Sequence, residues 1–255
     1  MSERDSPPGI RRPARTRPAS TVDEQAVTPD LRRSARIGFD EAVYGAGKSI
    51  TQIEEIVGVL SARGSGALFT RISPEQFAAL SPPTRDLLDH DPLSATAVLG
   101  AGGQPRAREV PAIAVISAGT SDLPVAREAV RTLQYYGEPV FEAYDCGVAG
   151  LWRVLEKLER LRTMKVVVVV AGMDAALPSV IGGLVPGVVV AVPTATGYGV
   201  AADGTSALNA VLASCAPGVV VVNIGNGYGA ACAALRVLGA PALPSGQEAA
   251  ARPTA

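Results

Sequence analysis

The sequence predicts an open, mostly parallel α/β sheet of about five strands with helices on both faces. In the second half of the 255-residue chain, five short apolar runs are each followed by a segment with helical character. Strands that alternate with helices form parallel sheets, because each crossover helix returns the chain in the same direction. Valine runs without polar alternation are typical of strands buried on both faces. Ahead of these runs we expect a small N-terminal α/β region.

The elements can be assigned in order along the chain. In the N-terminal region, the patterns predict a helix at 51–64, a strand at 67–73, and a helix that begins at Ser73-Pro74. In the second half, a helix with Pro124 in its first turn follows the first strand, and a continuous helix at 147–161 follows the second. The five predicted strands are PAIAVIS (111–117), EPVFEAYD (138–145), KVVVVVAG (165–172), GVVVAVP (187–193) and GVVVVNIG (218–225).

Composition divides the chain into four parts. Residues 1–35 are rich in arginine and proline and poor in large apolar side chains, so we expect a disordered tail. Residues 36–105 form a small N-terminal domain that ends in a linker, and residues 106–240 form the larger domain. Residues 241–255 are expected to be a flexible tail.

Composition also excludes several classes of function. A net charge of −1 and 4% aromatic residues disfavour nucleic-acid binding, which needs clustered cations or stacking platforms. Proline and glycine interrupt the uncharged stretches 175–202 and 204–235, so these read as core strands and helices and not as membrane spans. Three cysteines without CxxC spacing disfavour a disulfide scaffold or zinc site and suit a reducing cytoplasm. With His90 as the single histidine, a triad or multi-histidine metal centre is improbable.

In an open parallel sheet, ligands bind beyond the carboxyl ends of the strands. The functional loops are therefore expected at 117–122, 145–150, 171–175, 193–204 and 223–229. The first of them, SAGTSD, places small residues and hydroxyls where a strand turns into a helix, which favours an anion such as a phosphate. Helix capping by Ser121 or Asp122 accounts for part of the same pattern.

Charge is scarce in the second half of the chain. Between Val166 and Leu235 the only acids are Asp174 and Asp203, and lysine and arginine are absent. Asp174 follows a strand and reads equally well as a helix cap or as a base whose pKa is raised in an apolar cleft. The glycine-flanked Asp203 reads as a turn residue.

The three cysteines have different sequence contexts. Cys232 and Cys146 read as packing residues. Cys215, between a predicted helix and a strand, is either a buried structural residue or a nucleophile. With no histidine available, a nucleophilic role would need a nearby acid or a cationic substrate to favour the thiolate.

Several long stretches together resemble the LarB family. They are RIGFDEAVYGAGKSITQIEEI, AVISAGTSDLPVAREA, DCGVAGLWRVL, VVVVVAGMDAALPSVIGGLV, VAVPTATGYG and LNAVLASCAPGVVVVNIGNGYGAACAALRVL, within residues 34–240. The part from residue 111 also resembles carboxyaminoimidazole ribonucleotide mutase (PurE) in its first loop, its AG…ALP and VP motifs, and its closing strand and helix. The resemblance implies a PurE-like, flavodoxin-like three-layer sheet and a nucleotide-binding catalytic domain at 106–240.

LarB proteins are pyridinium-3,5-biscarboxylic acid mononucleotide synthases, which begin the assembly of the nickel-pincer nucleotide cofactor. The resemblance therefore implies carboxylation of nicotinic acid adenine dinucleotide at ring C5, with cleavage of the phosphoanhydride and release of AMP. It also implies CO2 or bicarbonate as co-substrate, Mg2+, a cytoplasmic homo-octamer and possible contacts with downstream cofactor-biosynthesis enzymes. Nothing in the sequence identifies the metal ligands.

The family's functional residues map onto this chain by motif. The cysteine nucleophile falls on Cys215 in SCAPG, and the cationic ring itself would favour its thiolate. The family's acidic residue, expected as Glu, falls on Asp174, which would remove the C5 proton or help position CO2. The resemblance implies phosphate and ribose contacts at Gly119, Thr120, Ser121 and Asp122, and further substrate contacts at Asp145, Gly147, Thr194, Tyr198 and Asn226.

One position departs from the family pattern. Trp152 stands where relatives are expected to have histidine (GVAGLHR), which would either impair proton transfer or provide a ring for stacking. Two alternative functions stay open: a PurE-like mutase, although YDCGVAG lacks the histidine of that class, and a catalytically silent nucleotide-binding or assembly protein.

Overall fold

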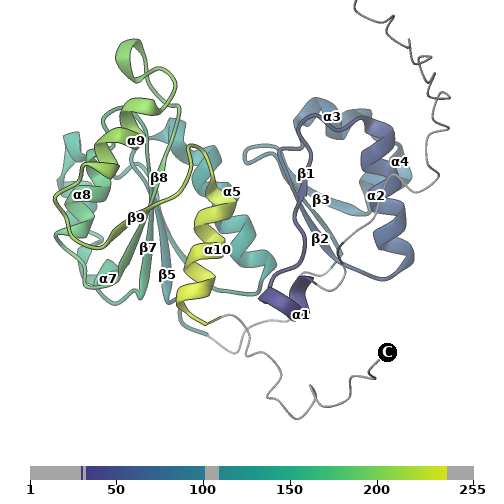
Figure 1. Cartoon of the computed structure of the whole chain (residues 1–255), viewed down its shortest axis with the longest axis horizontal. Coiled ribbons are helices and arrows are strands. Elements are labelled where there is room, and N and C mark those ends of the chain that lie inside the picture. The colour runs from purple at the N-terminus through teal and green to yellow at the C-terminus, as the bar shows by residue number, and fades with distance from the viewer. Residues whose placement is uncertain (1–29, 31–32, 101–108, 240–255) are drawn as a thin grey trace, which may run out of the picture.

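The structure is a computed structural model that describes residue 30, residues 33–100 and residues 109–239. The first continuous range is here called the N-terminal domain and the second the C-terminal domain, and the two lie side by side (Figure 1). The tails expected at 1–35 and 241–255 and the linker near 101–109 fall almost entirely outside the described residues.

The N-terminal domain is a four-stranded sheet with helices packed on it. Its strand order is β1-β2-β4-β3, with β1 parallel to β2 and the other pairs antiparallel. Ser49 and Ser73 each form a capping box with a glutamine three residues later, which fixes where α2 and α3 begin. The elements are α1 (Arg33–Ile37), β1 (Val43–Tyr44), α2 (Ile50–Ala62), β2 (Ala67–Thr70), α3 (Pro74–Ala79), α4 (Pro82–Asp86), β3 (Leu88–Asp91) and β4 (Thr96–Leu99).

The C-terminal domain confirms the predicted parallel sheet. Its five strands are all parallel and lie in the order β6-β5-β7-β8-β9. The strands are β5 (Ile113–Ser117), β6 (Val140–Ala143), β7 (Val166–Ala171), β8 (Val188–Pro193) and β9 (Val219–Val221). The helices are η1 (Thr120–Asp122), α5 (Leu123–Tyr135), η2 (Val148–Gly150), α6 (Trp152–Leu155), α7 (Leu158–Leu161), α8 (Ala176–Gly182), η3 (Gly199–Ala201), α9 (Thr205–Leu212) and α10 (Gly227–Val237).

The sheet is the middle layer of three. Helices α5 and α10 cover one face, and α6 to α9 cover the other (Figure 1). All six residues of β7 are buried, and the valines alternate between the two apolar cores, which explains the unbroken valine run in the sequence. The small N-terminal α/β region was also predicted correctly.

Two local predictions were wrong. The segment 147–161 is not a continuous helix but the short elements η2, α6 and α7. Within these elements only Val154 and Leu161 are buried, so few apolar contacts are available to hold one long helix against the sheet. In the N-terminal domain the strand predicted at 67–73 ends at Thr70, and β1, β3 and β4 were not predicted.

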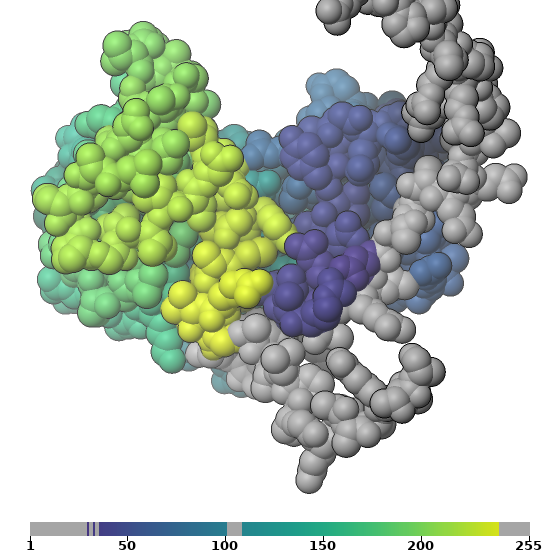
Figure 2. Space-filling view, in the orientation of Figure 1, coloured from purple at the N-terminus to yellow at the C-terminus, as the bar shows by residue number. Residues whose placement is uncertain are grey.

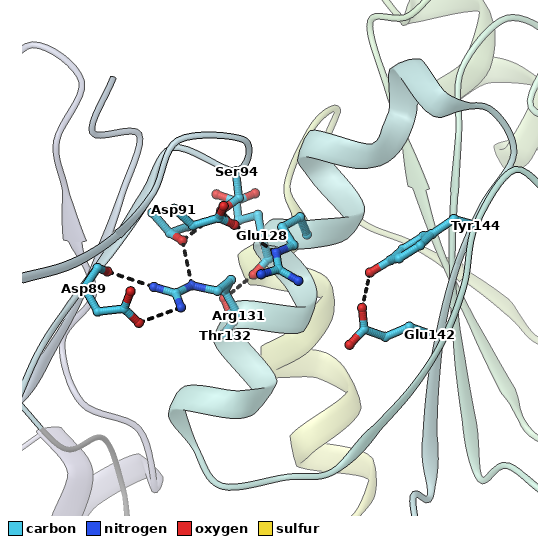
Figure 3. Close-up of polar contacts among 10 residues, drawn as sticks. Asp89, Asp91, Ser94, Glu128, Arg131, Thr132, Glu142 and Tyr144 are labelled. Atoms are coloured by element: carbon cyan, nitrogen blue, oxygen red, sulfur yellow. Dashed lines mark hydrogen bonds and ion pairs between the residues drawn. The ribbon is translucent and has the colours of Figure 1, made fainter. Parts of the chain in front are cut away.

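The N-terminal domain packs against α5 and α10. Phe39 and Leu68 belong to the same apolar cluster as buried residues of these two helices. Two arginines of α5 also reach across to β3. Arg131 donates to the Asp89 side chain (2.7 Å) and carbonyl (2.8 Å) (Figure 3), and Arg127 donates to Asp91 (2.9 Å). Among the described residues, no helix is long and apolar enough to cross a membrane.

Candidate active site

The strand order places a switch point between β5 and β7. The loop after β5 leads to α5 on one face of the sheet, and the loop after β7 leads to α8 on the other. Two neighbouring connections that diverge in this way leave a crevice at the carboxyl ends of their strands, where open α/β proteins bind ligands. The site is therefore built from the carboxyl-edge loops named in the sequence analysis.

A buried carboxylate joins the first and fourth of these loops. Asp122 is 2% exposed, and its two oxygens accept hydrogen bonds from the Gly119 amide (3.0 Å) and from the Thr194 hydroxyl (2.6 Å). The Thr194 oxygen in turn accepts from the Thr196 amide at 3.3 Å. Asp122 therefore ties the two loops together, while the neighbouring Thr120 and Ser121 are exposed and able to face a ligand.

The third loop is packed directly on the fourth. The Met173 amide donates to the Thr196 carbonyl at 2.7 Å. A Cβ at Gly172 would lie 2.4 Å from that same carbonyl oxygen and 2.6 Å from the Thr194 hydroxyl oxygen. Only glycine allows this close approach, so the AG motif is explained by backbone packing at the site.

Left-handed backbone is concentrated at this edge. Asp145, Met173 and Ala175 have φ angles of 54°, 54° and 45° without being glycine. Such conformations cost about 1–3 kcal/mol each and are often found at functional sites. Asp145 is exposed and pairs with Arg153 at 2.6 Å, and Gly147 lies so close to the first loop that a Cβ there would be 3.0 Å from a carbonyl oxygen.

Asp174 and Cys215 are both exposed and lie towards opposite ends of α8. Asp174 immediately precedes this helix, and one of its oxygens accepts a long hydrogen bond from the Ala176 amide (3.4 Å). Cys215 lies between α9 and β9, outside the carboxyl-edge loops. Its neighbour Ser214 contacts α8, because the Ser214 and Ser179 hydroxyl oxygens are 2.7 Å apart. In the single chain the Cys215 thiol is therefore accessible.

The remaining predicted contacts differ in accessibility. Tyr198 is 77% exposed, and Trp152 is 63% exposed on the outer helix layer. Asn226 accepts a hydrogen bond from the Gly229 amide (2.7 Å) and so caps α10. Asp203 accepts from the Thr205 amide at 2.9 Å, which supports its interpretation as a turn residue.

The other two cysteines are packed. Cys146 follows β6 and is 2% exposed, and burial raises the pKa of its thiol. Cys232 lies against the apolar core between α5 and α10, where burial also raises its pKa. Both therefore resist forming the thiolate, in contrast to the accessible position of Cys215.

The described residues do not provide a preformed metal site. Within residues 33–100 and 109–239, no group of three or more histidine, cysteine or acidic side chains is placed to hold a metal ion. His90 lies in β3, with its ring stacked on Phe77 and Nε2 3.0 Å from the Ile72 carbonyl oxygen, so its role is structural.

Sequence reasoning missed two residues at this edge. Arg71, which follows β2, donates a hydrogen bond to the Gly225 carbonyl, and Glu128 of α5 accepts from the Gly227 amide at 2.9 Å. Arg71 and Gly225 are 154 positions apart, so no local motif could have connected them.

Comparison with known proteins gives a consistent result. A family model described as the LarB/PurE-like N-terminal domain matches residues 22–100, and the AIR carboxylase model matches residues 112–247. An uncharacterised protein of Methanocaldococcus jannaschii is 38% identical over 214 residues, which cover 81% of this chain and 82% of the relative. The N5-carboxyaminoimidazole ribonucleotide mutase of Pyrococcus horikoshii is 33% identical over 139 residues, covering 51% of this chain and 74% of the mutase. A crystal structure of a single-residue variant of Treponema denticola PurE2 aligns with a TM-score of 0.43 and 20% identity, over 50% of this chain and 79% of that one.

Proposed function

The chain belongs to the LarB family, its C-terminal half is of the AIR carboxylase type, and we propose that it carboxylates the pyridinium ring of nicotinic acid adenine dinucleotide at C5. Family membership makes it an enzyme of the carboxylase or mutase type. The proposed products are AMP and pyridinium-3,5-biscarboxylic acid mononucleotide, the latter being a precursor of the nickel-pincer nucleotide cofactor.

One structural observation carries this choice of reaction. Cys215 offers an exposed thiol and Asp174 an exposed carboxylate, towards opposite ends of α8, in a chain whose only histidine is engaged elsewhere. A PurE-like mutase that depends on a histidine would lack that residue at this site, because His90 lies in β3. A thiolate and a carboxylate suit chemistry in which the substrate ring is first activated by nucleophilic addition.

The proposed steps balance without a redox partner. The Cys215 thiolate adds to the pyridinium ring, a C–S bond forms, and the displaced π electron pair neutralises the ring nitrogen. The resulting enamine attacks CO2 through C5, which forms the new C–C bond. The Asp174 carboxylate takes the C5 proton, and departure of the thiolate breaks the C–S bond and restores the aromatic ring. Water then cleaves the phosphoanhydride.

The loops supply the binding part of the proposal. Thr120 and Ser121 are exposed at the start of α5, where backbone amides favour a phosphate. Trp152 and Tyr198 are exposed apolar rings suited to stacking on a base or pyridinium. Mg2+ is expected with a phosphoanhydride substrate, and the described residues offer no ligand cluster for it.

The test is a mass-spectrometric assay with nicotinic acid adenine dinucleotide, Mg2+ and 13C-bicarbonate. We expect labelled biscarboxylated mononucleotide and AMP from the wild-type protein, and neither from Cys215→Ala. Cys232→Ala, which removes a packed thiol, serves as the matched control and keeps its activity. Asp174→Asn should slow turnover while still accumulating a substrate adduct on Cys215, visible as an increase in intact mass.

Three outcomes would contradict the proposal in whole or in part. Folded wild-type protein that binds the dinucleotide without any turnover would favour the silent nucleotide-binding protein. Turnover of carboxyaminoimidazole ribonucleotide in its place would favour the mutase. Full activity in Cys215→Ala would remove the covalent mechanism while leaving the overall reaction intact.

A further inference from the structure

Arg71 belongs to the N-terminal domain but extends to the carboxyl edge of the C-terminal sheet. It follows β2 in a left-handed conformation with φ of 60°. The backbone on both sides is fixed, because the Thr70 carbonyl accepts from the Gly45 amide (2.7 Å) and the Ile72 amide donates to the Ala95 carbonyl (2.8 Å). A non-glycine residue keeps this conformation only where its surroundings impose it, and such residues cluster at functional sites.

The guanidinium of Arg71 lies at the start of α10. It donates to the Gly225 carbonyl, and Nη2 is 3.7 Å from an oxygen of Glu128. Glu128 is buried and also accepts from the Gly227 amide, and burial raises its pKa while the charge of Arg71 opposes that shift. The Arg71 side chain remains 44% exposed, so a ligand can reach it.

This position adjoins the candidate active site. The Gly225 amide donates to the Pro193 carbonyl at 2.8 Å, and the next residue, Thr194, holds Asp122 of the first loop. Figure 2 shows a notch between the N-terminal domain and the upper loops of the C-terminal domain. Arg71 therefore lies beside the same loops that form the crevice.

The site otherwise has few cations. The stretch from Val166 to Leu235 contains no lysine or arginine, although it supplies three of the five loops. Arg153 is paired with Asp145 at 2.6 Å, and Arg127 is paired with Asp91 at 2.9 Å. By contrast, Arg71 donates to a neutral carbonyl and lies farther from its nearest carboxylate.

We propose that Arg71 binds an oxyanion of the substrate, so that the N-terminal domain contributes directly to the active site. The inference rests on the proposed function for the identity of the substrate, whose oxyanions are the phosphates and the ring carboxylate. Guanidinium binds both groups through paired N–H donors.

The N-terminal domain is held firmly enough for this role. Arg131 bridges to the Asp89 side chain and carbonyl, and the Asp91 carboxylate also accepts from the Ser94 hydroxyl at 2.8 Å (Figure 3). Arg131 belongs to α5, the helix that directly follows the first carboxyl-edge loop. These contacts help to hold the N-terminal domain, and with it Arg71, against the C-terminal domain.

The test compares Arg71→Met with Arg85→Met, because Arg85 lies in the same domain and also donates to a carbonyl, that of Ala78 (3.2 Å). We expect Arg71→Met to raise KM about tenfold or more, with a much smaller change in kcat, and Arg85→Met to match the wild type. Arg71→Lys should recover part of the loss. The double variant Arg71→Met/Glu128→Gln avoids leaving a buried unpaired carboxylate and keeps the comparison valid if the single variant unfolds.

Binding affinities measured by titration calorimetry distinguish a failure of the Arg71 proposal from a failure of the proposed function. The probes are nicotinic acid mononucleotide, nicotinic acid riboside and AMP. If Arg71 binds a phosphate, the variant loses affinity for the mononucleotide and AMP only; if it binds the carboxylate, it loses affinity for the mononucleotide and the riboside. If binding depends on Arg71 but the wild-type protein shows no turnover, the proposed reaction is contradicted and the role of Arg71 is not. Equal KM and equal affinities in the two methionine variants, or no binding of any probe by the wild type, would overturn the role of Arg71.

Discussion

The hydrogen bond between Thr194 and Asp122 should contribute more to stability than an ordinary buried hydroxyl contact. Thr194→Val keeps the shape of the side chain but removes its donor. The 2.6 Å bond to a carboxylate oxygen would be lost, along with the bond accepted from the Thr196 amide. Because Asp122 is 2% exposed, water cannot readily replace the missing donor.

The magnitude follows from the charge of the acceptor. Hydrogen bonds to charged groups contribute about 1.5–3 kcal/mol, against about 1 kcal/mol for neutral pairs. Thr132→Val is the matched control, since Thr132 is equally buried and its hydroxyl donates at 2.7 Å to the Glu128 carbonyl, a neutral helix acceptor. We expect Thr194→Val to cost about 1–2 kcal/mol more than Thr132→Val.

Urea unfolding followed by circular dichroism measures this difference. For a chain of this size, about 2 kcal/mol corresponds to a decrease in Tm of about 4–8 °C. Thr194→Val should also weaken binding of nicotinic acid mononucleotide, because the first and fourth loops would lose their tie. If Thr194→Val proved no more destabilising than Thr132→Val, the argument that Asp122 organises the site would be refuted.

Three further predictions follow from packing, charge and accessibility. Gly172→Ala should destabilise the fold by about 1–3 kcal/mol in urea unfolding, because its Cβ would lie 2.4 Å from a carbonyl oxygen. Gly58→Ala is the control: nothing lies within 4 Å of its Cβ, so this variant should stabilise the fold by about 0.4–1 kcal/mol. Burial acts to raise the pKa of Asp91, but hydrogen bonds from a serine and an arginine outweigh it and hold that pKa below its usual value. Asp91→Asn should therefore lower the free energy of unfolding by a constant amount at pH values above the unfolded pKa of about 3.9. This loss should disappear as the pH falls through the lower pKa of the folded state, and unfolding measured at a series of pH values checks it. Iodoacetamide at neutral pH should label Cys215 well before Cys146, as peptide mass spectrometry would show; faster labelling of Cys146 would contradict the burial of its thiol.

The main sheet could be predicted from the sequence because each of its strands is recognisable from its own residues. Each run of β7 and β8 is apolar throughout, and a strand buried on both faces needs no partner to be recognised. The short strands of the N-terminal domain carry no such signal. The residues of β3, Leu-Asp-His-Asp, are mostly polar, and they become a strand only by pairing with β4.

The candidate site was predictable in its loops but not in its contacts. Parallel topology alone locates the carboxyl-edge loops, because every strand ends at the same side. The burial of Asp122 and the approach of Arg71 depend on tertiary contacts that join positions 72 and 154 residues apart. The accessibility of Cys215 was also undecided in sequence, since a cysteine before a strand is as compatible with burial as with exposure.

The shared apolar cluster between the domains has a consequence for how the chain can be divided. Phe39 and Leu68 pack in one apolar cluster with residues of α5 and α10, and the C-terminal domain on its own would expose the part of that cluster that they cover. An expression fragment that begins after the linker would therefore tend to self-associate, even though its sheet contains every strand it needs. The boundary between the two family models therefore does not coincide with a break in the apolar core, because Phe39 and Leu68 pack across it.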